Sequence, residues 1–187
     1  MRFEEKTIRL KDGREAVLRC PREEDIPDML DYLYATAGET EFVLRYPEEC
    51  GKYTPEGEKA LFERMLASPN ELMLVCVTDG RVAGTCQLSF SAGLKTRHRG
   101  EVAVAQRKEF WGLGIGSAMF EAMIRIAEER PEVRQLELEF IEGNSRARAL
   151  YEKFGFRIAG VHPDAIRLKD GTLLAEYLMI RPIKRGE

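Results

Sequence analysis

One stretch decides the fold that we expect for this chain of 187 residues, and it reads Phe110-Trp111-Gly112-Leu113-Gly114-Ile115-Gly116-Ser117. The apolar residues 102–105 before it are short enough for a β-strand, and residues 118–129 after it carry apolar side chains at helical spacing. Three glycines at alternate positions therefore occupy a turn from a strand into a helix. Glycine allows positive φ angles and a close approach of backbone to a ligand, and the first turn of a helix presents N–H groups with partial positive charge. The sequence thus predicts a site for a phosphate or pyrophosphate at this turn.

The composition is that of an ordinary folded protein, and we expect one domain over residues 1–187. Hydrophobic residues make up 44% of the chain and the formal net charge is −3, which argues against nucleic acid as the main partner. No apolar run reaches membrane-spanning length and residues 1–6 do not resemble a signal peptide, so we expect a cytoplasmic protein with no membrane partner. The four cysteines lack the spacing of metal ligands, and we expect no metal site.

Turn and cap residues divide the rest of the chain into elements typical of an α+β protein. Asp-Gly pairs mark hairpin turns at residues 12–13, 79–80 and 170–171. Thr54 and Asn144 are expected helix N-caps. We expect residues 37–53 to be irregular and to form a candidate substrate-contacting segment. The expected helices cover residues 21–36, 54–67, 118–129 and 146–154, and the expected strands cover residues 7–10, 16–18, 72–77, 82–90, 102–105, 136–140, 156–168 and 172–180.

Two motifs resemble those of the GCN5-related N-acetyltransferases, the GNAT family. The family's acetyl-CoA-binding motif has Gln or Arg, two residues, Gly, one residue, then Gly or Ala. Gly114 and Gly116 match this motif, and Trp111 stands where Gln or Arg is more common. Residues 144–156 are similar to the family's second signature, which has Asn, then Ala and Leu-Tyr, then Gly-Phe. The resemblance covers roughly residues 72–179.

The resemblance implies the acyl-CoA N-acyltransferase fold. This fold is a mixed, mostly antiparallel central sheet, flanked by helices and splayed between its fourth and fifth strands, which here contain Val104 and Glu139. Acetyl-CoA is the implied co-substrate, with its pantetheine arm paired to the backbone of the fourth strand and its pyrophosphate held by N–H groups of the glycine turn. The implied cofactor-binding residues are Val104, Ala105 and Gln106 on the strand, Trp111, Gly112, Leu113, Gly114, Ile115, Gly116 and Ser117 at the turn, and Asn144 and Tyr151 in the second motif.

Acetyl transfer from a thioester to an amine needs placement of the reactants, a base for the amine and an acid for the leaving thiolate. Tyr151 is the candidate acid, because it matches the family tyrosine and its phenol has a pKa of ~10 when unperturbed. The alternative role for Tyr151 is packing in an apolar helix face. Asn144 is expected both to cap its helix and to bond the pantetheine arm.

The candidate base is Glu139, because a glutamate at this position acts as base in the protein N-terminal acetyltransferases that this chain resembles. Glu137 and Glu139 alternate with leucines, however, and this pattern is also typical of a solvated strand face. Glu101, at the start of the facing strand, and water are the alternatives for the base. We expect the basic loop at residues 91–100 to be solvated, and attraction of an anionic substrate by Lys95, Arg97 and Arg99 is the alternative.

The favoured function is an acetyl-CoA-dependent N-acetyltransferase, a single domain that acetylates a primary amine of a small molecule, an amino acid or a peptide N-terminus. A non-catalytic acyl-CoA sensor is an alternative. A dinucleotide-binding oxidoreductase is another, but its Gly-x-Gly-x-x-Gly pattern, begun at Gly112, is broken by Ser117. A homodimer is compatible with the family. No pattern in the sequence identifies the amine that accepts the acetyl group.

Overall fold

The computed structural model describes residues 1–183, and its strands belong to one mixed sheet. Contacts along the chain divide it into two units, which are described separately. The first unit is Met1–Ser89 with Val104–Met119, and the second is Phe90–Ala103 with the described part of Phe120–Glu187. Over the described range, no helix is long and apolar enough to cross a membrane.

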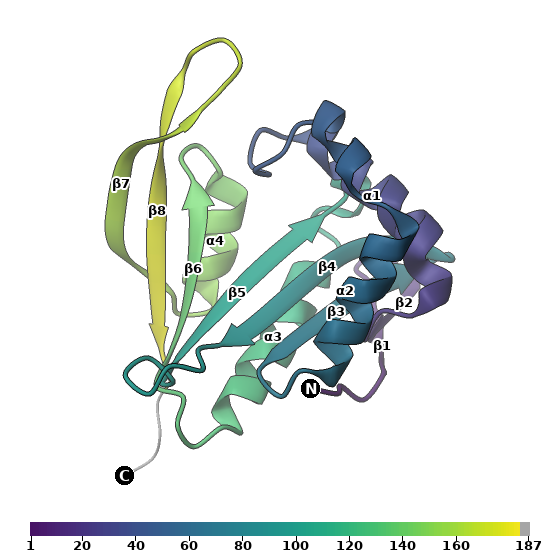
Figure 1. Ribbon diagram of the computed structural model, residues 1–187, viewed down its shortest axis with the longest axis horizontal. Helices are drawn as coiled ribbons and strands as arrows, with labels where there is room; N and C mark the ends of the chain where they lie inside the picture. Colours follow the sequence, from purple (N-terminus) through teal and green to yellow (C-terminus); the bar gives the residue numbers. More distant parts are fainter. Residues whose placement is uncertain (184–187) are drawn as a thin grey trace. The chain divides into compact units, whose positions relative to one another are not determined.

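The first unit contains strands in the order β1-β2-β3-β4-β5 (Figure 1). Their bounds are Lys6–Arg9 (β1), Glu15–Arg19 (β2), Glu71–Thr78 (β3), Arg81–Phe90 (β4) and Arg99–Gln106 (β5). The pairs β1–β2, β2–β3 and β3–β4 are antiparallel. Asp79 and Gly80 have φ angles of 51° and 74°, which are the left-handed values that a two-residue hairpin turn requires. The predicted hairpins at residues 12–13 and 79–80 are therefore confirmed.

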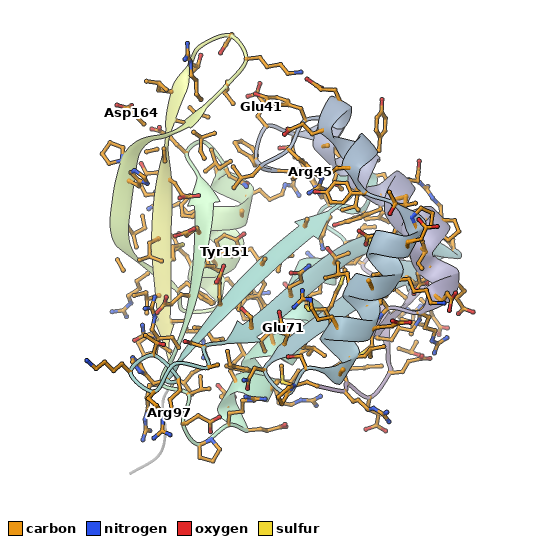
Figure 2. The ribbon with its side chains drawn as sticks, viewed as in Figure 1. Glu41, Arg45, Glu71, Arg97, Tyr151 and Asp164 are labelled. Carbon is orange, nitrogen blue, oxygen red and sulfur yellow. The ribbon has the colours of Figure 1, made fainter. Side chains whose placement is uncertain are left out.

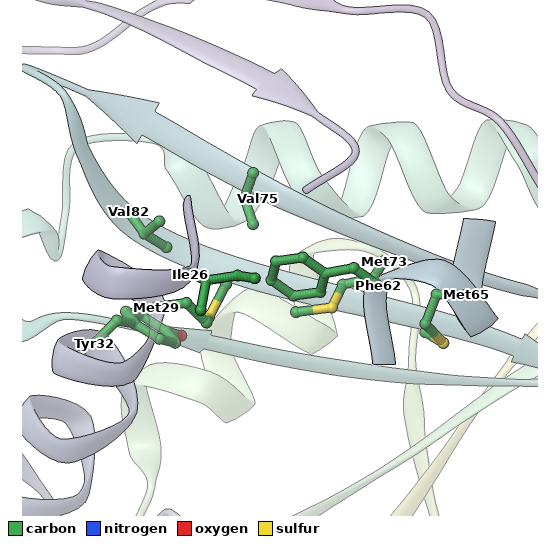
Figure 3. Close-up of a cluster of buried hydrophobic side chains, with 8 residues drawn as sticks. All are labelled: Ile26, Met29, Tyr32, Phe62, Met65, Met73, Val75 and Val82. Atoms are coloured by element: carbon green, nitrogen blue, oxygen red, sulfur yellow. The ribbon is translucent and has the colours of Figure 1, made fainter. Parts of the chain in front are cut away.

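Two helices, α1 (Ile26–Glu39) and α2 (Pro55–Ala67), supply the apolar core of this unit. The core cluster joins these helices to β3 and β4, and it consists of Ile26, Met29, Tyr32, Phe62, Met65, Met73, Val75 and Val82 (Figure 3). Thr54 caps α2 as predicted, because its Oγ1 accepts a hydrogen bond of 3.1 Å from the Gly57 N–H.

The predicted boundaries of α1 were wrong at both ends. The helix is preceded by a 3-10 turn, η1 (Glu23–Asp25), and it continues to Glu39 rather than ending near residue 36. Ala37 is buried, so one more turn of helix gains contact with the core. The segment after it, expected to be irregular, contains a second 3-10 helix, η2 (Pro47–Lys52).

The end of β5 is anchored to α1 by Arg107, which is 2% exposed. Its backbone N–H donates to the Ala83 carbonyl at 3.0 Å, and its guanidinium donates to the Val82 carbonyl at 3.0 Å. The same guanidinium pairs with Asp28 at 3.2 Å and Asp31 at 2.9 Å. A buried cation with these partners fixes where β5 ends and the segment toward the glycines begins.

The second unit continues the strand order as β5-β6-β8-β7 (Figure 1). Its elements are β6 (Gln135–Ile141), α4 (Ser145–Lys153), β7 (Arg157–Arg167) and β8 (Leu173–Pro182), with most of α3 (Ile115–Glu128). β6 and β7 both pair antiparallel with β8, whereas β5 pairs parallel with β6. The core is aromatic, with Phe120 stacked on Phe154 at 5.4 Å between ring centroids and at 5.8 Å from Phe156.

Gly84 on β4 allows a close approach of β5, and this produces a prediction for stability. A Cβ at residue 84 would lie 3.0 Å from the Ala105 carbonyl oxygen and 2.9 Å from Cγ of Gln106. We expect Gly84→Ala to lower the free energy of unfolding by about 1–3 kcal/mol, because the backbone of β5 must move. The control Gly51→Ala adds its Cβ where nothing lies within 4 Å and should change it by less than about 0.5 kcal/mol. Equal urea midpoints for the two variants would contradict the prediction.

Candidate active site

Two glycines shape the turn between β5 and α3. Gly112 and Gly114 have φ angles of 81° and 99°, which side chains rarely adopt. A Cβ at either position would meet no atom within 4 Å, so the backbone conformation, and not a contact inside the protein, demands glycine there. The third glycine of the motif, Gly116, lies inside α3. The turn therefore leaves open space beside its backbone.

Hydrogen bonds hold this turn in shape. Nε1 of Trp111 donates to the Gln106 carbonyl at 3.1 Å, and the backbone N–H of Lys11 donates to the Leu113 carbonyl at 3.1 Å. The Ala118 N–H donates to the Gly114 carbonyl at 3.1 Å, which begins the hydrogen bonding of α3. The amides of Ile115 and Gly116 precede that bond, at the positive end of the helix. The first turn of α3 has no acidic residue, so its described side chains do not oppose a bound anion.

The pairing of β5 with β6 stops early. It covers Arg99 with Gln135, Gly100 with Leu136 and Glu101 with Glu137, although β5 continues to Gln106 and β6 to Ile141. Among the described residues, no further pair joins these two strands. Beyond Glu101, β5 thus has a backbone edge on the β6 side that suits an added strand.

A charged pair fixes the end of the sheet where β5 and β6 are joined. The Arg99 guanidinium donates to both carboxylate oxygens of Glu137, at 2.6 and 2.5 Å, and Gln135 donates to one of them. The hydrogen bonds from Arg99 hold the pKa of Glu137 below its usual value. Glu137 is 8% exposed, so the expectation that Glu137 belongs to a solvated face is wrong. Arg99, which was expected to lie in a loop, is instead the first residue of β5.

Gln106, the last residue of β5, has an unsatisfied polar group. Its Nε2 is buried, and it has no hydrogen-bond partner within the described part of the chain. Val104, Ala105 and Gln106 are all half-buried. The strand end predicted to bind pantetheine thus includes a buried amide donor as well as backbone groups.

The second motif forms α4 as predicted. The side-chain oxygen of Asn144 accepts a 3.2 Å hydrogen bond from the Ala147 N–H and so caps the helix. Tyr151, which is labelled in Figure 2, is 8% exposed. Its ring centroid lies 5.4 Å from that of Phe120 and 6.1 Å from that of Phe140. Burial raises the pKa of Tyr151 to about 12, so its phenol stays protonated at neutral pH.

The two carboxylates predicted as alternative bases lie on neighbouring strands of the second unit. Glu139 is exposed, and its neighbour Phe140 contacts Tyr151. Because side chains alternate along a strand, Glu139 and Tyr151 belong to opposite faces of β6. Glu101 is also exposed and lies opposite Glu137 in the register, on the same face as Glu139. Both remain candidates.

Glu58 and Arg45 are two charged residues of the first unit that the sequence patterns did not place in the interior, and both are at least half-buried. Glu58 is 5% exposed, on the core side of α2 with Phe62 and Met65. Its spacing of i, i+4 and i+7 with those two residues was the signal that places it inward. Arg45 follows α1 in the segment expected to be irregular, and no sequence pattern singles it out.

The glycine turn and the capped helix α4 are the two features on which the resemblance to the GNAT family rested. The profile of the acetyltransferase (GNAT) family matches residues 31–156, more than half of the chain, and the chain belongs to that family. It is an acetyltransferase. Among residues 1–183 there is no group of three or more His, Cys, Asp or Glu side chains placed to hold a metal ion.

Individual relatives agree with this assignment. An L-amino acid N-acetyltransferase of Escherichia coli, AaaT, is 26% identical over 64% of this chain and 73% of its own length. The structure of a GNAT acetyltransferase from Streptococcus pneumoniae has a TM-score of 0.82 and 24% identity, over 90% of this chain and 99% of that one. The structure of YncA from Salmonella typhimurium, solved with its cofactor acetyl-CoA, has a TM-score of 0.75 and 17% identity over 91% and 95% of the two chains.

The left-handed turn predicts the effect of a substitution on cofactor binding. Gly114→Val should raise the Kd of CoA by about 10–100-fold, because a β-branched residue at positive φ costs about 1–3 kcal/mol and its side chain enters the open space. Gly171→Val is the matched control, since Gly171 has a φ of 92° with nothing within 4 Å and lies in the β7–β8 hairpin turn. Calorimetric titration with CoA measures both variants. Unchanged affinity in Gly114→Val would show that the turn does not hold the cofactor.

Proposed function

We propose that this chain transfers the acetyl group of acetyl-CoA to a primary amine of a small molecule, an amino acid or a peptide N-terminus, by direct attack of the amine. The turn at Gly112 and Gly114 is the observation that carries the proposal. It offers open backbone space at the N-terminus of α3, with no acidic residue in the first helical turn. A pyrophosphate matches both the geometry and the charge of such a site.

The cofactor contacts follow from the same geometry. The amides from Gly112 to Ser117 would hold the pyrophosphate, with Trp111 fixing the turn through Gln106. The backbone of Val104, Ala105 and Gln106 would bond the pantetheine arm as an added strand, on the edge that β5 exposes once its pairing with β6 has ended. Asn144 uses its side-chain oxygen for the cap, which leaves its NH₂ group for the arm.

The chemistry needs a proton acceptor and a proton donor. Glu139 accepts a proton from the ammonium form of the acceptor, directly or through water, with Glu101 and water alone as alternatives. The neutral amine then forms the N–C bond to the acetyl carbon as the C–S bond breaks. Tyr151 donates its proton to the departing thiolate, and the second proton that the nitrogen loses as the amide forms restores the phenol. Placement of the two reactants supplies most of the remaining rate enhancement.

An amino acid is the acceptor class that the comparisons favour. AaaT, named as an L-amino acid N-acetyltransferase, is 26% identical to this chain. This resemblance supports an acceptor with an α-amino group.

Release of free thiol from acetyl-CoA tests the proposal. The purified protein is assayed with amino acids, polyamines, aminoglycosides and short peptides. Acceptor-dependent release is expected, with amino acids giving the fastest rates. Binding of CoA with no release from any acceptor would overturn the proposal and favour an acyl-CoA sensor.

Replacement of the phenol tests the role of Tyr151. Tyr151→Phe should lower kcat on the order of 10²-fold while leaving the Kd of CoA unchanged, because the ring packing is kept and only the acid is lost. Since the pKa of Tyr151 lies near 12, the wild type should lose no activity through this group between roughly pH 7 and 10. Tyr177→Phe is the control, a tyrosine stacked on Phe140 at 5.1 Å with no proposed role. A collapse of CoA binding in Tyr151→Phe would show a structural role instead.

A further inference from the structure

The side-chain amide of Gln106, at the end of β5, finds no acceptor in the protein. Its Nε2 is buried, and no atom of residues 1–183 accepts a hydrogen bond from it. The backbone at this position is fixed, in contrast. The Gln106 carbonyl accepts a bond of 3.1 Å from Nε1 of Trp111, and the N–H of Arg107 donates to the Ala83 carbonyl at 3.0 Å. Because a buried N–H without a partner is costly, we expect its acceptor to come from outside the chain.

Gly84, on the neighbouring strand β4, gives this side chain its room. A Cβ at residue 84 would lie 2.9 Å from Cγ of Gln106 and 3.3 Å from Cε of Met119. The Gln106 side chain therefore lies over the space that the glycine leaves open, on the face of the sheet that carries Met119 of α3. Gly84 and Met119 are both buried, and neither has an oxygen or nitrogen in its side chain to accept the Nε2 hydrogens.

The unpaired donor lies beside the glycine turn. Trp111 of that turn bonds the Gln106 carbonyl directly. Met119 follows Ile115, the first residue of α3, by four positions, which is about 6 Å along the helix axis. The Gln106 amide, the turn and the first amides of α3 thus belong to one stretch of the first unit, in which the backbone and the side-chain donors all lack a described anion or carbonyl partner at the turn.

We propose that the Gln106 carboxamide binds coenzyme A, with Nε2 donating a hydrogen bond to an acceptor oxygen where the pantetheine arm meets the diphosphate. This inference rests on the proposed function, and it adds a side-chain contact to the backbone contacts proposed at residues 104–106. Phosphate oxygens and the amide carbonyls of the arm are both acceptors of the required kind. A hydrogen bond formed at a site buried from solvent is stronger than one formed in water.

The inference predicts opposite effects of one substitution on stability and on binding. Methionine resembles glutamine in length and has no N–H or O–H donor. Gln106→Met should leave the Tm of the CoA-free protein unchanged or raise it, because the variant lacks the unpaired buried donor. It should raise the Kd of CoA about 3–10-fold, which is the effect of one neutral hydrogen bond. A glutamine that only stabilised the fold would give a lower Tm instead.

The first experiment measures both quantities on the same proteins. Calorimetric titration gives the Kd of CoA, and thermal unfolding gives Tm with and without CoA. The stabilisation by CoA should be smaller in Gln106→Met than in the wild type, because stabilisation by a ligand falls as its Kd rises. The matched control is Gln87→Met, which makes the same chemical change at an exposed position of β4 and should change neither quantity. Gln106→Leu, which also lacks a donor, repeats the test should the methionine variant not fold.

The second experiment identifies the acceptor oxygen. ADP contains a diphosphate without the arm, and pantetheine contains the arm without a phosphate. Displacement of CoA by each fragment gives its affinity for the wild type and for Gln106→Met. A weaker affinity for ADP alone assigns the hydrogen bond to a phosphate oxygen, and a weaker affinity for pantetheine alone assigns it to a carbonyl of the arm. Unchanged affinity for both fragments and for CoA refutes the contact.

Specific outcomes separate this inference from the proposed function. Equal Kd values of CoA for the wild type and Gln106→Met refute the inference alone and leave ordered water as the partner of Nε2. A lower Tm with an unchanged Kd also refutes it. If the wild type binds CoA but no acceptor releases thiol, the proposed function fails, and the binding measurements still decide the role of Gln106. If the wild type does not bind CoA, both fail.

Discussion

The short pairing of β5 with β6 is the constraint on which the rest of the site depends. Three residue pairs join the strands, with Glu137 clamped by Arg99 at that end. Gly100 lets its neighbours close in, since a Cβ there would lie 2.8 Å from Leu136 and 3.0 Å from Phe90. Beyond Glu101 the strands are not paired with each other. β5 and β6 are therefore paired at one end only. Farther along, among the described residues, the backbone groups of β5 have no partner on β6.

Two features define the segment from β5 to α3 in the first unit, the backbone of the glycine turn and the buried charge of Arg107. The pyrophosphate site that we propose at the glycine turn and the first amides of α3 would depend on backbone conformation. Arg107 then fixes the end of β5, because its guanidinium donates to the Val82 carbonyl on β4 and pairs with the Asp28 carboxylate on α1. Through this connection the helix that leads into the Arg45 segment is held against the strand that leads into the glycine turn.

The sequence predicted what depends on local chemistry. Asp-Gly turns, the Thr54 and Asn144 caps and the glycine turn all follow from conformational rules that act over a few residues, and the family motifs added the fold. The burial of Glu137 depends instead on Arg99, a residue distant in sequence, and the placement of Glu58 depends on the core that α2 faces. Arg45 is anchored by carbonyl and hydroxyl groups of α1, which no pattern in its own segment reveals. Sequence rules therefore predicted the turns and caps, and they missed the burial of charged residues, which depends on contacts between residues distant in sequence.

We propose that the backbone of the glycine turn and of the β5 end binds coenzyme A. Changes in backbone amide chemical shifts on addition of CoA test this binding directly. In a titration of the ¹⁵N-labelled protein with CoA, the largest shifts should fall on residues 112–117 and 104–106, with slowed hydrogen exchange at Ile115 and Gly116. Shifts confined to other segments, with residues 112–117 unmoved at saturation, would contradict the account.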